Sequence, residues 1–158
     1  MAIQFWQDKD RTQLNPTLFS EVAEAEAKKV YSSAEGRGRD VKKNKPTQLR
    51  RFFDEIIAFE SRYKQMLCKN PGEPEKVFMQ QLPFIHMLIP KVKYAEARNL
   101  VSRDFVELVK SAVVDNLKQS ADLKVLTSFF EAFMGHYKYC VMIEGSQYQN
   151  NDRNRGRY

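Results

Sequence analysis

The amino-acid sequence predicts an all-α fold, a compact bundle of five to six helices. Apolar residues recur mostly at three- and four-residue steps over several stretches, which is the period of an amphipathic helix, and no stretch has a strand pattern. Prolines and glycines separate these stretches. A chain of 158 residues has the length of one domain with a single core. We therefore expect one helical domain over residues 1–145, with a loop at about 33–46, and a disordered basic tail over 146–158.

The first helix is expected over residues 16 to about 34, because Asn15 is a favoured N-cap and Pro16 suits the first helical position. The stretch SSAEGRGRD then interrupts the pattern with two glycines and predicts a mobile loop. Thr47 is expected to cap a second helix, over residues 48 to about 69. The apolar face of this helix consists of Leu49, Phe52, Phe53, Ile56, Phe59, Tyr63 and Met66.

Prolines shape the third helix, which begins at Pro74 after the turn KNPGEP. Its pattern crosses Pro83 and Pro90, and a proline inside a helix costs about 3 kcal/mol or kinks or breaks it. We expect a bend near Pro83 and a break near Pro90. A short helix should follow over residues 94–98.

Two further helices complete the predicted bundle. Ser102 should cap the first, which runs to about residue 118, and Asp122 the second, which runs to about residue 143. The tail GSQYQNNDRNRGRY is polar, has no periodicity and carries three arginines, which favours disorder. The inward-facing residues of the two helices are Phe105, Val109, Ala112, Val113 and Leu117, and then Leu126, Phe129, Phe130, Phe133, Tyr137 and Cys140.

Composition excludes several classes of protein. No apolar run approaches the ~20 residues of a membrane span, and the start MAIQFWQDKD lacks the basic-then-apolar order of a signal peptide. Cys68 and Cys140 are far apart and in no metal spacing, which fits a reducing cytosol and predicts two buried thiols. We expect a cytoplasmic protein without membrane contact.

Positive charge is concentrated in one stretch. The whole chain carries a net charge of +6, and the segment from Glu35 to Arg51 alone carries +5, from seven basic and two acidic residues. A basic block on a nearly balanced body indicates a polyanionic partner at one site. The alternative is a solvated loop whose charge serves solubility.

Enzyme motifs are nearly absent. The sequence has no Walker-type glycine loop, no G-x-G-x-x-G and no G-x-S-x-G. His86 and His136 lie on different predicted helices without paired ligand spacing, and Glu131 has no visible acid–base partner. We therefore expect no catalytic residue, no metal site and no cofactor.

Three basic residues of the second helix share one edge. Each residue turns a helix by about 100°, so Arg51, Arg62 and Lys69, which are 11 and 7 residues apart, lie within about 20° of one another. Pairing of Arg51 with Glu55 is the alternative to contact with a phosphate.

Two more basic groups flank this stripe. Lys42, Lys43 and Lys45 precede the second helix, whose N-terminus favours an anion through its partial positive charge and free amides. The other group surrounds Tyr94, an arrangement suited to basic contact and aromatic packing, and consists of Lys91, Lys93 and Arg98.

Three blocks of sequence resemble the small subunit of the type III-A CRISPR–Cas effector, the Csm complex. TQLRR (47–51) resembles that family's S-Q-[LI]-R-K helix start, and LIPKVKYAEAR (88–98) its apolar–basic run ending in Y-x-x-x-R. FEAFMGHYKY (130–139) resembles its closing helix. The blocks occur in the family's order and cover roughly residues 42–144, with the two prolines of the third helix and the ending CVMIEG as departures.

The resemblance implies a small helical protein without catalysis that stacks in copies along a ribonucleoprotein beside its backbone and large subunits. It further implies contact with the backbone of a guide–target RNA duplex, mainly the target strand, without base reading. Tyr94 and Tyr137 are expected in the core. The residues that it marks for RNA contact are Lys45, Gln48, Arg50, Arg51, Lys91, Lys93 and Arg98; Lys42, Lys43, Arg62 and Lys69 rest on charge and spacing alone.

Other hypotheses stay open from the residues. One is the equivalent small subunit of the type III-B (Cmr) complex, which is also helical and basic. Another is a helical nucleic-acid-binding adaptor or regulator outside CRISPR, although a recognition helix of exposed Arg, Asn and Gln is not evident. A helical-bundle enzyme would need a convergent set of ligands or acid–base residues.

Overall fold

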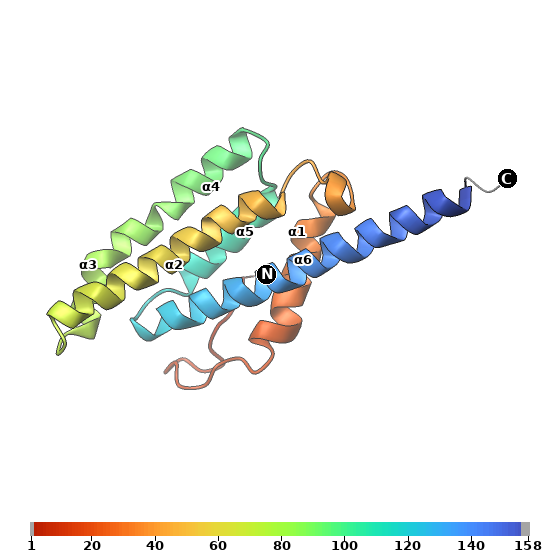
Figure 1. Ribbon diagram of the computed structural model, residues 1–158. Helices are drawn as coiled ribbons and strands as arrows, with labels where there is room; N and C mark the ends of the chain where they lie inside the picture. The colour runs from red at the N-terminus through yellow and green to blue at the C-terminus, as the bar shows by residue number, and fades with distance from the viewer. Residues whose placement is uncertain (1, 156–158) are drawn as a thin grey trace.

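Two long helices, α2 (Pro46–Lys69) and α6 (Ala121–Arg155), lie side by side at the front of the computed structural model (Figure 1). α1 (Ala23–Ser32) crosses α6, and α3 (Pro74–His86) and α4 (Leu88–Ala97) run back along α2. α5 (Arg103–Lys110) packs against α4 and α1. The structure describes residues 2–155, with side chains through Gln147. The predicted all-α bundle is confirmed.

Short segments of other geometry join these helices. The π-helical turns Leu18–Val22 and Ser111–Asp115 precede α1 and follow α5, and Gly38–Asp40 form a 3₁₀ turn. Residues 2–155 contain no strand, and their only β-type pairing is one bridge between Trp6 and Leu14.

Phe105 of α5 lies at the centre of the core. Its ring centroid is 5.5 Å from that of Phe52 in α2 and 6.2 Å from that of Phe133 in α6. Apolar spacing predicted these inward faces correctly, because every predicted inward residue of α2, of α5 with the segment that follows it to Leu117, and of α6 is buried except Met66 and Cys140, which are half-buried.

The N-terminal segment closes the core, which the sequence did not indicate. Phe5 is fully buried, 5.8 Å from the ring of Phe129. The amide of Ile3 donates to Ser111 Oγ at 2.9 Å, and that of Phe5 to Asn116 Oδ1 at 3.0 Å. An extended strap without periodicity has no sequence signature of burial.

Two predicted N-caps are wrong. α2 begins at Pro46, with Lys45 in the cap position and no side-chain cap, so Thr47 lies inside the helix. Asp122 lies in the first turn of α6, where it accepts the amides of Lys118 and Gln119 and an ion pair from Arg11. Ser102 caps α5 as predicted, by accepting the amide of Phe105.

The first helix and the break in the third differ from prediction. Asn15 accepts the amide of Thr17 at 3.1 Å, but the helix that follows starts as a π-turn and becomes α-helical only at Ala23. The third helix breaks at Met87 instead of Pro90. A proline ring clashes with the carbonyl four residues earlier, here that of His86, so the break precedes the proline. α4 is also longer than predicted.

The loop between α1 and α2 is packed instead of mobile. The amide of Gly38 donates to Tyr31 Oη at 2.6 Å, and Tyr31 Oη donates to Glu144 Oε2 of α6 at 2.9 Å. A Cβ on Gly38 would lie 2.7 Å from the Cα of Gly145, so only glycine permits this approach. The glycines that indicated flexibility instead allow close packing.

The end of the chain also differs. α6 continues to Arg155 instead of ending near residue 143, because no proline or glycine interrupts residues 146–155. The predicted helix end near residue 143 is therefore wrong, the disorder of the tail stays a prediction, and residues 156–158 lie outside the described range. Cys68 is exposed and Cys140 half-buried, so the prediction of two buried thiols is also wrong.

Candidate nucleic-acid interface

Asn44 joins the loop before α2 to the turn before α5. Its Nδ2 donates to Ser102 Oγ at 2.8 Å, and its Oδ1 accepts the amide of Ser102 at 2.8 Å. Nδ2 also donates to the carbonyl of Val30 at 3.0 Å. The amide of Asn44 donates to the carbonyl of Leu100 at 3.0 Å, and Tyr137 Oη donates to the carbonyl of Asn44. Asn44 is fully buried, with a φ of 57° that asparagine tolerates better than most residues.

The hydrogen bonds of Asn44 bring two basic groups that are distant in sequence, those of residues 42–51 and 91–98, to one end of the bundle. The start of α2 and the end of α4 lie at the same end, because the two helices run antiparallel (Figure 1). An ion pair of 2.8 Å between Lys91 Nζ and Glu55 Oε2 joins the facing edges of the helices. The segment 42–51 and the segment 91–98 therefore form one surface.

The α2–α4 edge is defined here as Arg51, Lys91, Tyr94 and Arg98. Lys91, Tyr94 and Arg98 are spaced by three and four residues and so share one side of α4, the side that Lys91 turns toward α2. Arg51 is one turn before Glu55 on α2 and so lies on the facing edge. Glu55 pairs with Lys91, and Arg51 has no ion pair within the described side chains, so the alternative pairing of Arg51 with Glu55 is not formed.

Tyr94 is exposed, which corrects its expected place in the core. It is 65% exposed, whereas Tyr137 is fully buried as expected, and burial raises the pKa of the Tyr137 hydroxyl. The guanidinium carbon of Arg98 lies 5.7 Å from the centroid of the Tyr94 ring. The spacing Y-x-x-x-R thus places a cation over an aromatic face one turn away.

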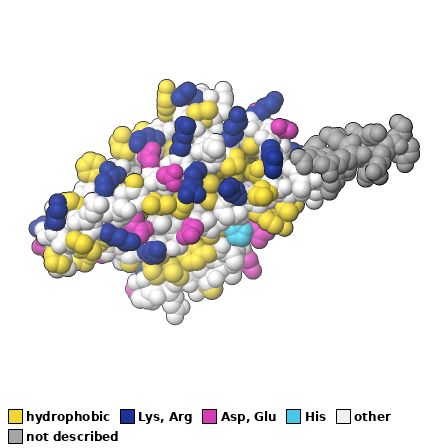
Figure 2. Space-filling view, viewed as in Figure 1, with side chains coloured by type: hydrophobic (Ala, Val, Ile, Leu, Met, Phe, Trp, Pro, Cys, Tyr) yellow, Lys and Arg dark blue, Asp and Glu magenta, His cyan; other side chains and the backbone are white. Residues whose placement is uncertain are grey.

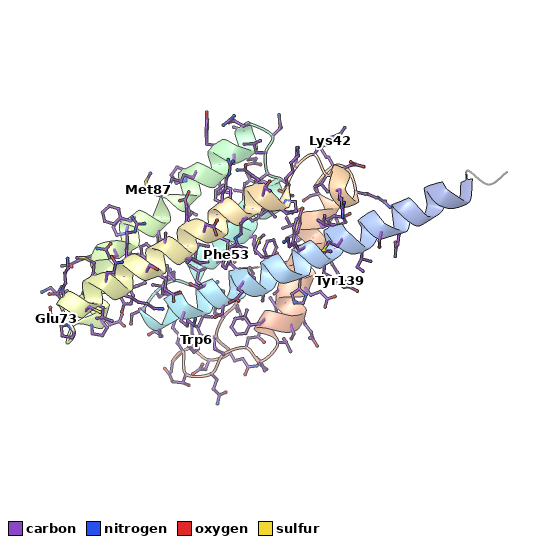
Figure 3. The ribbon with its side chains drawn as sticks, viewed as in Figure 1. Trp6, Lys42, Phe53, Glu73, Met87 and Tyr139 are labelled. Carbon is purple, nitrogen blue, oxygen red and sulfur yellow. The ribbon has the colours of Figure 1, made fainter. Side chains whose placement is uncertain are left out.

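Arg50 and Lys93 point elsewhere. Arg50 Nε pairs with Asp54 at 3.0 Å and its guanidinium lies 5.4 Å from the Phe53 centroid, on the α6 side of α2. There it lines a mostly apolar groove of about 640 Å³ between α2 and α6, with Phe53 facing it (Figure 3). Lys93 is about 200° around α4 from Lys91 and lies on the opposite edge.

Of the three lysines before α2, one forms an ion pair and two do not. Lys43 Nζ pairs with Glu35 at 2.8 Å, and this contact lowers the pKa of the Glu35 carboxyl. Lys42 and Lys45 are exposed without an ion pair among the described side chains. The helix start offers fewer free amides than expected, because Pro46 has none and Gln48, half-buried, donates its own to the carbonyl of Lys45 at 2.8 Å.

Arg62 and Lys69 lie outside the α2–α4 edge. Both are exposed on the same edge of α2 as Arg51, but about 16 and 27 Å further along the helix axis. They extend the basic stripe toward the opposite end of the bundle. Among the charged side chains of this face of the molecule, Lys and Arg predominate (Figure 2).

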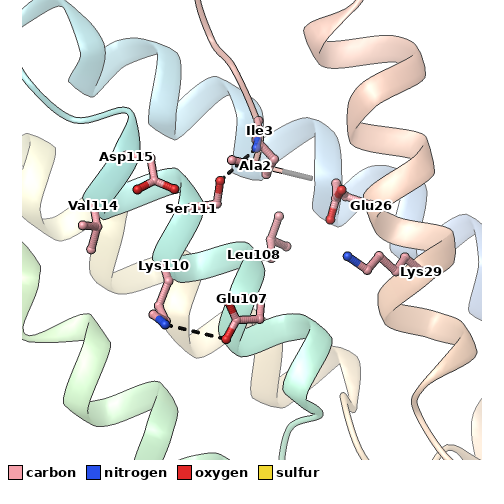
Figure 4. Close-up of a pocket in the computed structure, with 10 residues that line it drawn as sticks. All are labelled: Ala2, Ile3, Glu26, Lys29, Glu107, Leu108, Lys110, Ser111, Val114 and Asp115. Carbon is pink, nitrogen blue, oxygen red and sulfur yellow. Dashed lines mark hydrogen bonds and ion pairs between the residues drawn. The ribbon is translucent and has the colours of Figure 1, made fainter.

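A second concavity, of about 360 Å³, lies between α1, α5 and the N-terminal segment (Figure 4). Its charges are mixed, with Glu26, Lys29 and Lys110 among the lining residues, and neither histidine nor cysteine lines it. Among residues 2–155, no group of three His, Cys, Asp or Glu is placed to hold a metal ion. Within the same part, no helix has the length and apolarity to cross a membrane.

Together, the fold and this surface define a class: an all-helical protein with basic side chains gathered at one end of the bundle. The family model Csm2 Type III-A matches residues 24–141, which is well over half of the chain. The chain therefore belongs to the Csm2 family, small subunits of the type III-A CRISPR Csm complex. The match begins in α1, further toward the N-terminus than the resemblance had reached. No curated protein and no solved structure matches the chain.

Sequence reasoning missed two residues that organise this surface. Asn44, which lies among three lysines, was not singled out from the sequence, although an asparagine two residues before a proline is a common sign of a turn. Tyr94 was assigned to the core, although its i,i+4 spacing to Arg98 was a signal of a surface pair.

Proposed function

We propose that this protein is a non-catalytic RNA-binding subunit of the Csm complex. It contacts the phosphates and sugars of the target RNA in the guide–target duplex without reading bases. It works in the cytoplasm beside the backbone and large subunits and in contact with further copies of itself. The match to the Csm2 family supports the complex, and favours it over the type III-B alternative.

The observation that carries the RNA contact is the joining of two basic groups through Asn44. Arg51, Lys45 and Arg98 come from separate segments and make no ion pair in the described part of the chain. Exposed cations gathered without carboxylate partners favour a polyanion over internal pairing. Lys42, Lys43 and Gln48 lie beside this set, and Arg62 and Lys69 continue it along α2 in the direction of an elongated ligand. Arg50 and Lys93 would contact RNA from the other edges of their helices.

The test is a charge reversal at Arg51 with a matched control. Arg51→Glu should weaken binding of the purified protein to two unrelated RNAs by the same factor, because phosphate contacts carry no sequence information. Arg103→Glu makes the same charge change at an exposed arginine of α5 that already pairs with Glu96 and Glu107, and should leave affinity nearly unchanged. Equal losses in both variants, or a loss confined to one RNA, would contradict the proposal.

A further inference from the structure

The most exposed large hydrophobic or aromatic side chain among the described residues belongs to Tyr94, at 65%. The tyrosines Tyr31, Tyr63 and Tyr137 are buried, and each hydroxyl has a hydrogen-bond partner. Tyr94 Oη makes no hydrogen bond within the described range. Its exposure therefore serves neither the core nor a polar contact of this chain.

The surroundings of Tyr94 are cationic. Arg98 lies over the ring at 5.7 Å, and Lys91 precedes Tyr94 by three residues on the same side of α4. The carboxylate on the facing edge of α2, Glu55, is already paired with Lys91 at 2.8 Å. Arg98 makes no ion pair among the described side chains, and an exposed aromatic ring beside basic side chains is the combination by which proteins bind single-stranded nucleic acid.

We propose that Tyr94 is a stacking platform for one unpaired RNA base, with Arg98 supporting the ring and Lys91 near the adjoining phosphate. This inference rests on the proposed function and adds a base contact to it. Stacking on an aromatic ring tolerates any base, because every base has a π-face. Tyr94 therefore adds affinity for unpaired nucleotides without adding sequence specificity.

The experiment measures binding of single-stranded RNA that carries 2-aminopurine, with affinity and fluorescence followed together. Tyr94→Phe should retain both. Tyr94→Ala should weaken binding at least about fivefold, which is the lower end of the effect of losing a base–aromatic stack. It should also reduce the quenching of 2-aminopurine fluorescence that stacking on the tyrosine ring causes. The salt slope should not change, because no phosphate contact is lost. The matched control is Tyr139→Ala, which removes a tyrosine of α6 that is 64% exposed and should leave both readouts unchanged.

Two further RNAs separate stacking from charge. Annealing the complementary strand hides the bases, so Tyr94→Ala should change duplex affinity less than about twofold. An abasic strand of equal length should bind the unchanged protein as weakly as the normal strand binds Tyr94→Ala. Equal effects of Tyr94→Ala on single-stranded, duplex and abasic RNA would overturn the stacking.

Failure of this inference can be told from failure of the proposed function. If the unchanged protein binds RNA with a steep salt slope and Tyr94→Ala alters nothing, only the stacking is wrong. If Tyr94→Ala leaves RNA binding intact but prevents copies of the protein from associating, Tyr94 belongs to a protein interface and the stacking is also wrong. If the unchanged protein binds no RNA at low salt, both proposals fall.

Discussion

Asn44 and Ser102, 58 residues apart, exchange two hydrogen bonds of 2.8 Å each, one to the hydroxyl and one from the amide of Ser102. This pair holds the lysine-bearing loop against the turn between α4 and α5, and thereby assembles the surface that we propose for RNA.

Substitution of Asn44 should destabilise the protein through buried polar groups. Asn44→Ala leaves the amide of Ser102 and the carbonyl of Val30 without their partner, at about 1–3 kcal/mol for each unsatisfied group. Asn44→Gly loses the same bonds but tolerates the φ of 57°, so it should be the more stable variant by about 1 kcal/mol. Urea denaturation measures both. A loss below about 1 kcal/mol for Asn44→Ala would contradict this role.

Core aromatic residues should show large effects. Phe129 is fully buried between Phe5 and Phe130, and Phe52 is 5% exposed against Phe105. Replacing either with Ala should cost about 3–5 kcal/mol in the free energy of unfolding. Phe84→Ala serves as the control, since Phe84 is 58% exposed and its loss should cost under about 0.5 kcal/mol. Similar values for buried and exposed positions would refute the assignment of the core.

The two neighbouring arginines of α2 should behave differently. Each single-strand phosphate contact contributes a slope of about −0.7 in log K against log salt, so Arg51→Ala should flatten the slope by about that amount. Arg50→Ala should change it less, because Arg50 already pairs with Asp54 on the α6 side. Salt titrations on two unrelated RNAs measure both slopes. An unchanged slope with a melting temperature several degrees lower for Arg51→Ala would make Arg51 a structural residue.

Glu60 should contribute stability that depends on pH. Burial raises the pKa of its carboxyl, but hydrogen bonds from Lys64 and Thr127 outweigh this, so the pKa lies below its usual 4.5. A depressed carboxyl pKa stabilises the fold above the unfolded value, and this contribution disappears as pH falls through the folded value. Glu60→Gln should therefore lower stability at pH 7 by about 1 kcal/mol, and the difference should shrink below about pH 4.5.

The control for this titration is Glu21→Gln, since Glu21 is exposed and has no ion pair among the described side chains. Denaturant unfolding at several pH values should show no such convergence for this variant. A constant difference between Glu60→Gln and the unchanged protein down to pH 3 would contradict the assigned coupling.

Purified protein should cleave neither RNA nor DNA, with or without Mg²⁺. The described residues hold no carboxylate and imidazole cluster for a metal-assisted hydrolysis. Incubation with labelled substrates and gel analysis provides the measurement. Cleavage that survives purification and disappears with a single substitution in this chain would contradict the non-catalytic role.

Periodicity by itself determined which faces of α2, α5 and α6 are buried, because side chains three and four residues apart share one side of a helix wherever that helix lies. It also placed Arg51, Arg62 and Lys69 on one edge of α2. Family-like blocks of sequence identified the family, which the match over residues 24–141 confirms. The buried faces follow from local spacing, and the family follows from the order of sequence blocks along the chain, so neither depends on tertiary contacts.

Tertiary structure alone decided which basic residues meet. The hydrogen bonds of Asn44 and the Lys91–Glu55 pair, both between distant segments, bring the start of α2 and the end of α4 to one end of the bundle, whereas Arg62 and Lys69 lie further along α2. Packing likewise exposed Tyr94, buried Phe5 and held the glycine loop against α6. Each outcome depends on which neighbouring element covers a side chain, and the sequence pattern of a single helix or loop does not indicate which elements pack against it.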